Sequence, residues 1–171
     1  IGTANVATGG SFVIDASQWA GLNNLNVTQS GGGTVAAPSA CALNLTDLAF
    51  GNGVVKVNGA GNVVANIAGV GSGSVNIAAA GSVVLTETLA NGSVAGNITV
   101  SGGQSITVNQ KHLETMGSGR NAALTINGST QSSTVSIDSA SDLFQPGASR
   151  LNQITINDTA AGTGATGGIK T

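Results

Sequence analysis

The sequence predicts an all-β protein, most simply a parallel β-solenoid, and three observations lead to that prediction. Short segments with apolar residues at alternate positions recur along the whole chain. One stretch repeats itself with a period of roughly 20 to 25 residues. Turns that contain glycine separate the segments, and the chain holds 27 glycines in 171 residues. A β-sandwich of the Ig-like type remains the alternative, because it would also show many short strands.

The internal repeat covers residues 73–110, and each of its two copies contains two strand signals. The apolar pairs are Val75/Ile77 with Val83/Leu85 in the first copy, and Ile98/Val100 with Ile106/Val108 in the second. A short strand of this kind cannot bury its apolar face alone, so neighbouring copies are expected to stack on one another. The uneven spacing of strand signals elsewhere is the main argument against a strict solenoid.

The N-terminal part reads as a strand, a corner and a second strand. Phe12 and Ile14 lie on one face of the first strand signal. Residues 15–21 break the alternation, and Asp or Ser before a short run ending in Gly predicts one helical turn or a corner. Trp19 is expected to cover apolar surface there, and the alternation resumes over residues 22–28.

The rest of the chain continues the same pattern. Glycines 31–33 are expected to form a loop, and Asn-Gly pairs at 52–53, 58–59 and 91–92 predict tight turns. Residues 110–116 are the one run that indicates a helix, of one or two turns. Further strands are expected at 43–46, 55–58, 63–67, 124–127, 135–138 and 154–157.

A longer repeat links the two ends of the chain. The order strand, Asp, corner and strand occurs over residues 14–28 and again over residues 137–157. We therefore interpret residues 1–171 as a single all-β repeat module, and we expect it to be a fragment of a longer tandem-repeat protein.

Composition argues against several classes of function. Charged residues make up 7% of the chain, the net charge is −2, and the five Lys and Arg residues are scattered, so no nucleic-acid surface is expected. No apolar run is long enough for a transmembrane segment. With few carboxylates, no Tyr and one Trp, the chain is poorly equipped to be a polysaccharide lyase or hydrolase, and we predict that it is not an enzyme.

Few residues are candidates for chemistry. Cys41, the sole cysteine, is expected to be a small buried apolar residue, and His112, the sole histidine, lacks the partners that catalysis or metal binding needs. Asp138 and Asp142 are expected to share a corner, where carboxylate and carbonyl oxygens would suit Ca²⁺. The alternative is that each Asp caps a turn.

Residues 14–28, Ile-Asp-Ala-Ser-Gln-Trp-Ala-Gly-Leu-Asn-Asn-Leu-Asn-Val-Thr, resemble the repeat units of bacterial β-strand-repeat surface proteins. These comprise S-layer proteins and giant type I-secreted adhesins. Residues 154–171 resemble the repeat ends of the same class, and residues 73–110 are similar to filamentous haemagglutinin repeats. The Gly-Gly-x-Gly-x-Asp nonapeptide of calcium-binding β-rolls is missing from the chain.

The resemblance implies a secreted protein of the bacterial cell surface. The expected function is a non-enzymatic structural module that self-assembles into an S-layer or extracellular filament, with Ca²⁺ as a possible ion. Expected partners are copies of itself, adjacent modules of the same chain and cell-surface polysaccharide. The alternative is an adhesin module that binds host or glycan surfaces through its corners at Trp19, 111–116 and 142–146. A carbohydrate-active β-helix enzyme is a third, weaker reading, since it would need an acidic cleft.

Overall fold

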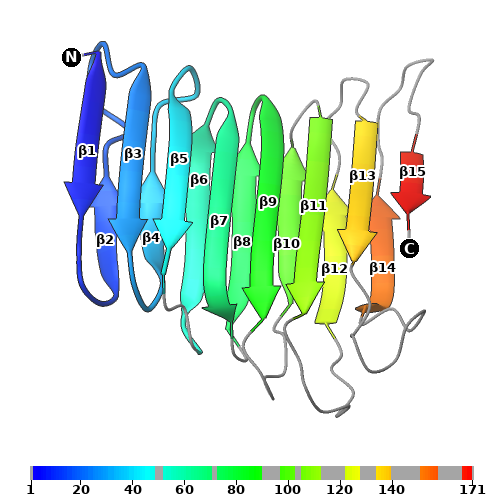
Figure 1. Ribbon diagram of the computed structural model, residues 1–171. Helices are drawn as coiled ribbons and strands as arrows, with labels where there is room; N and C mark the ends of the chain where they lie inside the picture. Colours follow the sequence, from blue (N-terminus) through cyan, green and yellow to red (C-terminus); the bar gives the residue numbers. More distant parts are fainter. Residues whose placement is uncertain are drawn as a thin grey trace.

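The computed structural model describes residues 2–48, 52–70, 73–89, 97–102, 105–112, 122–127, 134–139, 151–157 and 167–170. Within these ranges the chain forms fifteen β-strands and no helix. Odd-numbered and even-numbered strands lie in two layers that face each other, and the ends of the chain lie at opposite ends of the stack (Figure 1).

The two layers are named here the odd sheet and the even sheet. The odd sheet holds β1 (Thr3–Ala7), β3 (Asn24–Gln29), β5 (Ala42–Asp47), β7 (Val63–Val70), β9 (Ser82–Leu89), β11 (Ser105–His112), β13 (Thr134–Ser139) and β15 (Gly167–Lys170). The even sheet holds β2 (Phe12–Asp15), β4 (Gly33–Ala36), β6 (Val54–Ala60), β8 (Ser74–Ala79), β10 (Ile98–Gly102), β12 (Ala122–Asn127) and β14 (Leu151–Asn157).

Every pair of neighbouring strands in both sheets is parallel. The chain therefore passes alternately through the two sheets, and each coil adds one strand to each. This architecture confirms the predicted parallel β-solenoid. It differs from the alternative β-sandwich, whose sheets are antiparallel.

The coils are of similar length through the middle of the stack. Leu25, Leu43, Val63, Val83 and Ile106 are successive register partners in the odd sheet, so these coils are 18, 20, 20 and 23 residues long. Strand register is kept while the coil length changes, because the connections between strands take up the difference. The uneven spacing in the sequence is thus compatible with a solenoid.

The sequence repeat of residues 73–110 corresponds to two stacked coils. Val75 pairs with Ile98 and Ile77 with Val100 in the even sheet, and the odd sheet pairs the remaining apolar residues in the same way. All eight residues named for this repeat are at most 2% exposed: Val75, Ile77, Val83, Leu85, Ile98, Val100, Ile106 and Val108.

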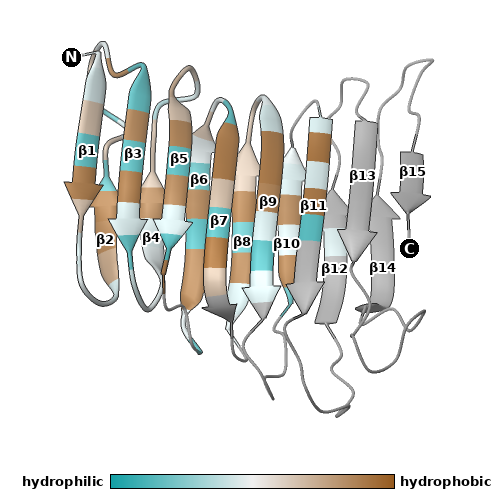
Figure 2. Ribbon diagram, viewed as in Figure 1, coloured by the Kyte–Doolittle hydropathy of each residue, from teal (hydrophilic) through white to brown (hydrophobic). Residues whose placement is uncertain are grey.

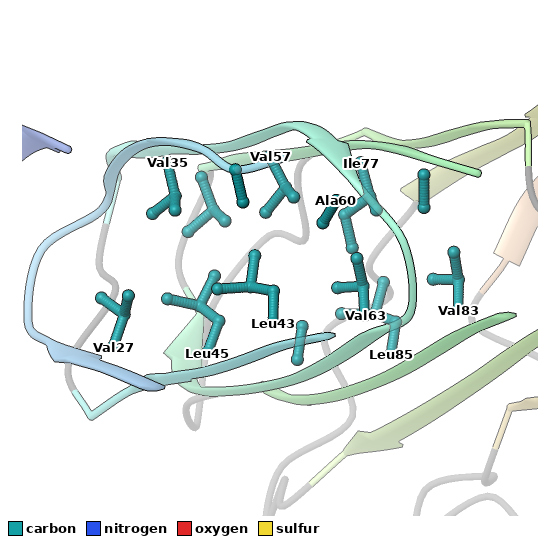
Figure 3. Close-up of a cluster of buried hydrophobic side chains, with 14 of the residues drawn as sticks. Val27, Val35, Leu43, Leu45, Val57, Ala60, Val63, Ile77, Val83 and Leu85 are labelled. Atoms are coloured by element: carbon teal, nitrogen blue, oxygen red, sulfur yellow. The ribbon is translucent and has the colours of Figure 1, made fainter. Parts of the chain in front are cut away.

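The core fills the space between the two sheets. Val35, Val57 and Ile77 of the even sheet face Leu43, Leu45 and Leu85 of the odd sheet (Figure 3). Alternate residues along a strand point to opposite faces, so hydropathy alternates along the strands in Figure 2. Burying one such side chain contributes about 1.5–3 kcal/mol, and the repetition of the pattern holds the stack together.

Three strands were not expected from the sequence. These are β1, β4 and β15, and the sequence of each contains a single large apolar residue. In β4, for example, Gly33 was expected in a loop and Val35 is the single large apolar residue. The strands form because the neighbouring coil supplies a hydrogen-bonding edge.

Two predictions of local structure were wrong. Asn58–Gly59 is not a turn between strands but a bulge inside β6, where Gly59 has a φ of +80° and the pairing with β8 shifts between Val57 and Ala60. The predicted helical turns at 110–116 conflict with β11, which runs through His112 and pairs with β9 along its whole length. Residues 113–116 lie outside the described part of the chain.

The two copies of the longer repeat start in opposite sheets. Ile14 lies in β2 of the even sheet, whereas Ile137 lies in β13 of the odd sheet. The strand that begins the pattern therefore belongs to a different sheet in each copy, and residues 140–150 of the second corner lie outside the described part of the chain.

Candidate functional site

A column of buried residues that includes three polar side chains runs inside the odd sheet, near the ends of its strands. Gln29, Asp47, Ile67 and Glu87 are successive register partners, and all four are at most 1% exposed. Burial of a carboxylate is unfavourable unless hydrogen bonds replace its water. Asp47 and Glu87 are therefore the least expected feature of this core.

Asp47 is the last residue of β5, and its side chain contacts the turn that leads into β4. Its Oδ2 accepts hydrogen bonds from Gln29 Nε2 at 2.8 Å and from the Gly32 amide at 2.9 Å, and its Oδ1 accepts one from the Gly31 amide at 3.2 Å. Gly31 and Gly32 have φ values of +95° and +85°, a conformation that other residues rarely adopt. The carboxylate thus accepts hydrogen bonds from two turn amides, the buried one of Gly32 and the partly buried one of Gly31, and holds the turn against the next coil.

Sequence reasoning missed this column, although a signal was present. The inward alternation Leu43, Leu45 continues to Asp47, and Val83, Leu85 continues to Glu87. Continuing the period of two by one step would have placed both carboxylates inside. They are inaccessible from solvent, so the column is structural.

The corner after β2 is held by Asp15. Its Oδ1 accepts hydrogen bonds from the Ser17 hydroxyl at 2.6 Å and the Ser17 amide at 3.0 Å, and these bonds hold the pKa of Asp15 below its ordinary value. Two turns follow, with the Trp19 amide donating to the Ala16 carbonyl and the Leu22 amide donating to the Trp19 carbonyl. The structure thus places two successive turns at the predicted corner.

Trp19 covers the corner only in part. Its side chain is 40% exposed and borders a hollow of about 330 Å³, which the next coil closes with Pro38 and Ala40. Gln18 and Asn23 add amide groups to the rim. An exposed indole beside amides is an arrangement that binds ligands with one apolar face and several hydroxyls.

A second hollow lies on the outer face of the even sheet. It measures about 370 Å³ and crosses β6, β8 and β10, and its rim carries Lys56, Asn58, Asn76, Thr99 and Ser101. Ala78 lies between Asn58 and Ser101, and its small side chain leaves the surface hollowed at that point. Lys56 is the one cationic side chain in the part of the chain whose side chains the structure describes.

The outer face of the odd sheet carries no charged residue among its described side chains. Asn26 donates to Asn5 at 2.7 Å, and Asn44 donates to Asn26 at 2.8 Å, so three coils share one ladder of amides. The outward residues of β1 to β11 that the structure describes are Thr3, Asn5, Ala7, Asn24, Asn26, Thr28, Ala42, Asn44, Thr46, Val64, Asn66, Ala68, Ser82, Val84, Thr86, Thr88, Ser105, Thr107 and Asn109.

The structure describes only part of the predicted Ca²⁺ site. Asp138 lies in β13, with its backbone in register with Asn109 and Lys170, while Asp142 and the Asp138 side chain lie outside the described part, so the Ca²⁺ prediction stays a prediction. The His112 backbone ends β11. No group of three or more His, Cys, Asp or Glu side chains suited to a metal is present among the described residues.

Cys41 is buried in the core with a free thiol, as predicted. Its Sγ donates weakly to the Ala42 carbonyl oxygen at 3.4 Å. Burial raises the pKa of the Cys41 thiol above its ordinary value. A protonated thiol inside the core is a poor nucleophile, which agrees with the apolar role.

Comparison with known proteins identifies no relative. No protein-family model matches the chain, and no curated protein or solved structure is significantly similar to it. Within the described residues, no helix has the length and hydropathy needed to cross a lipid bilayer.

Proposed function

We propose that this chain is a non-enzymatic structural module of a secreted bacterial cell-surface protein, and that it assembles end to end into filaments or layers. The observation that carries the proposal is the N-terminal coil. Its inward residues Ala4, Val6, Phe12 and Ile14 are only partly buried, whereas their register partners in the following coils are almost completely buried.

The N-terminal coil also presents two open hydrogen-bonding edges. β1 and β2 are the outermost strands of the two sheets, and each has a strand neighbour on one side in the described structure. An edge with a half-open apolar interior is suited to pairing with another β-coil. The occupant we propose is a coil from a second copy or from an adjacent module of the same kind.

The opposite end of the stack supplies a matching edge. β15 and β14 end the odd and even sheets at the far side from β1 and β2. If β15 of one copy pairs with β1 of the next, and β14 pairs with β2, the parallel arrangement continues without interruption. Such head-to-tail contacts do not close on themselves, so they build open filaments rather than dimers.

The low charge of the outer surface also favours association. The odd sheet's described outer face is uncharged, so copies that lie side by side experience little electrostatic repulsion. The two described interior carboxylates are fully buried, which is in keeping with a structural role rather than catalysis.

Negative-stain electron microscopy at micromolar protein, with and without Ca²⁺, tests the proposal. We expect fibres or sheets with one repeating unit of constant width. Monodisperse particles under both conditions would contradict self-assembly. Fibres or sheets that form only with Ca²⁺ would in addition support the predicted role of Asp138 and Asp142. Asp138→Asn should then abolish the Ca²⁺-dependent assembly.

A second candidate function, an adhesin module for glycans, is favoured by the exposure of Trp19. Because Trp19 is the sole tryptophan, its fluorescence reports directly on the corner hollow. Neutral oligosaccharides that stack on the indole should change the emission of the wild type and of Val13→Ala, whose substitution lies on the outer face of the adjacent strand. Trp19→Ala has no tryptophan emission, so its loss of binding is measured by isothermal titration calorimetry, in which Val13→Ala should still bind. Unchanged emission across a panel of neutral glycans would rule out this site.

A further inference from the structure

We propose that the hollow on the even sheet, named here the Lys56 groove, binds a carboxylated oligosaccharide. The groove is formed by Lys56, Asn58, Asn76, Ala78, Thr99 and Ser101. It lies on the side of the solenoid rather than at its end, so the proposal does not depend on end-to-end assembly.

The strand register explains why a groove forms at this place. Lys56, Asn76 and Thr99 are register partners, so their side chains form one row across β6, β8 and β10. Ala78 and Ser101 are partners in the next outward row, which Asn58 begins at the bulge of β6. The small Ala78 therefore lies within the second row, between Asn58 and Ser101, and the first row of larger polar side chains runs beside it.

The groups around the groove match the chemistry of an acidic sugar. Lys56 provides an exposed ammonium group for a carboxylate. The side-chain amides of Asn58 and Asn76 and the hydroxyls of Thr99 and Ser101 can each donate and accept hydrogen bonds. Such groups pair well with the hydroxyls of a sugar. A ligand site of this kind needs only a few placed polar groups.

The dimensions favour an elongated ligand. Neighbouring strands are about 4.8 Å apart, so the groove runs for about 10 Å from β6 to β10. That length and the hollow of about 370 Å³ suit a short run of sugar rings rather than a small anion. Asp15, the one described carboxylate on this outer face, lies in β2, two strands from β6.

The test is a titration followed by the amide signals in ¹⁵N NMR spectra, with short oligogalacturonates as the probe. The methyl-esterified oligomer is the matched control ligand, since it keeps the sugar backbone and loses the charge. We expect a dissociation constant of about 1 mM or tighter for the acid, with shifts confined to β6, β8 and β10, and at least roughly tenfold weaker binding of the ester.

Two variants with equal net charge locate the contact. Lys56→Gln should weaken binding of the acid roughly tenfold, because it removes one charge-assisted hydrogen bond. Lys111→Gln, which removes the same charge from β11 of the odd sheet, should leave the affinity unchanged. Equal losses in both variants would show general charge attraction and overturn the proposal.

Three further results would also overturn it. These are no binding of the acid, equal binding of the ester, and equal binding of polyglutamate, which would make the site one for anions in general. All titrations use the Ile14→Lys background, which is expected to stay monomeric and to leave the Lys56 groove intact, so none of these results coincides with a failure of fibre formation.

Discussion

Gln29 and Asp47 are register partners in adjacent coils, and a 2.8 Å hydrogen bond from Gln29 Nε2 to Asp47 Oδ2 joins them inside the solenoid. The same carboxylate accepts hydrogen bonds from the amides of Gly31 and Gly32. One buried side chain therefore fixes two strands of the odd sheet and the turn toward the even sheet. The register between coils is set by polar contacts as well as by apolar packing.

Replacing Asp47 should destabilise the solenoid strongly. Asp47→Ala leaves the buried donors of Gln29 and Gly32, and the partly buried Gly31 amide, without this acceptor. Each unsatisfied buried donor costs about 1–3 kcal/mol, so we expect a loss of about 2–6 kcal/mol in the free energy of unfolding. Urea unfolding followed by circular dichroism measures this loss. Asp15→Ala, the same substitution at an exposed corner, is the control and should cause a much smaller change. Equal losses in the two variants would show that the buried hydrogen bonds of Asp47 stabilise the fold no more than the exposed ones of Asp15.

Two leucines in one coil test the orientation of β5. Leu45 is 1% exposed and Leu48 is 63% exposed, although they are three residues apart. Leu45→Ala should reduce the free energy of unfolding by about 2–5 kcal/mol, since it opens a cavity between the sheets. Leu48→Ala, an identical change in chemistry, should reduce it by less than about 0.5 kcal/mol. A larger loss for Leu48→Ala than for Leu45→Ala would contradict the orientation of β5 described here.

The alternation of apolar residues was sufficient to predict the solenoid and most of its strands. Val75, Ile77 and their partners share the interior because a strand repeats every two residues and the coils stack in register. The strands β1, β4 and β15 were missed because their stability comes from the neighbouring coil, a contribution that a local pattern does not contain. Asn58–Gly59 was misread for a similar reason, since the same dipeptide suits a turn and a bulge.

The candidate sites were harder to predict than the fold. Asp47 could have been placed inside by continuing the alternation, but its acceptor role depends on Gly31 and Gly32, which lie 16 and 15 residues away. The Lys56 groove joins residues from three coils. Neither their register nor the small side chain of Ala78 at the centre is visible as a motif.

Glycine at position 53 should be required by the stacking of corners. A Cβ atom there would lie 2.5 Å from the Gly31 carbonyl oxygen in the preceding coil. Gly53→Ala should therefore lower the free energy of unfolding by about 1–3 kcal/mol in a thermal or urea melt. Gly9→Ala is the matched control, since nothing lies within 4 Å of its Cβ position, and it should be neutral or slightly stabilising. A neutral Gly53→Ala would show that the corners are loosely packed.

The buried thiol of Cys41 predicts a dependence of stability on alkaline pH. Its pKa is raised in the folded chain, so the unfolded thiol loses its proton first as the pH rises above about 9. The stabilisation that this raised pKa provides is present at neutral pH and is lost as the pH rises toward the folded-state pKa. The difference in unfolding free energy between the wild type and Cys41→Ala should shrink over that range. A constant difference would mean that Cys41 is exposed to solvent.

Sedimentation velocity of two lysine variants in β2 tests the proposed end-to-end assembly most directly. Ile14 points into the half-open N-terminal coil, whereas its neighbour Val13 is 77% exposed on the outer face. An inward charge at a sheet end blocks pairing with another coil. We predict that Ile14→Lys keeps its β-sheet circular dichroism and sediments as a monomer, while Val13→Lys and the wild type form growing oligomers. Oligomers of Ile14→Lys as large as those of the wild type, or monomers in all three samples, would contradict the account.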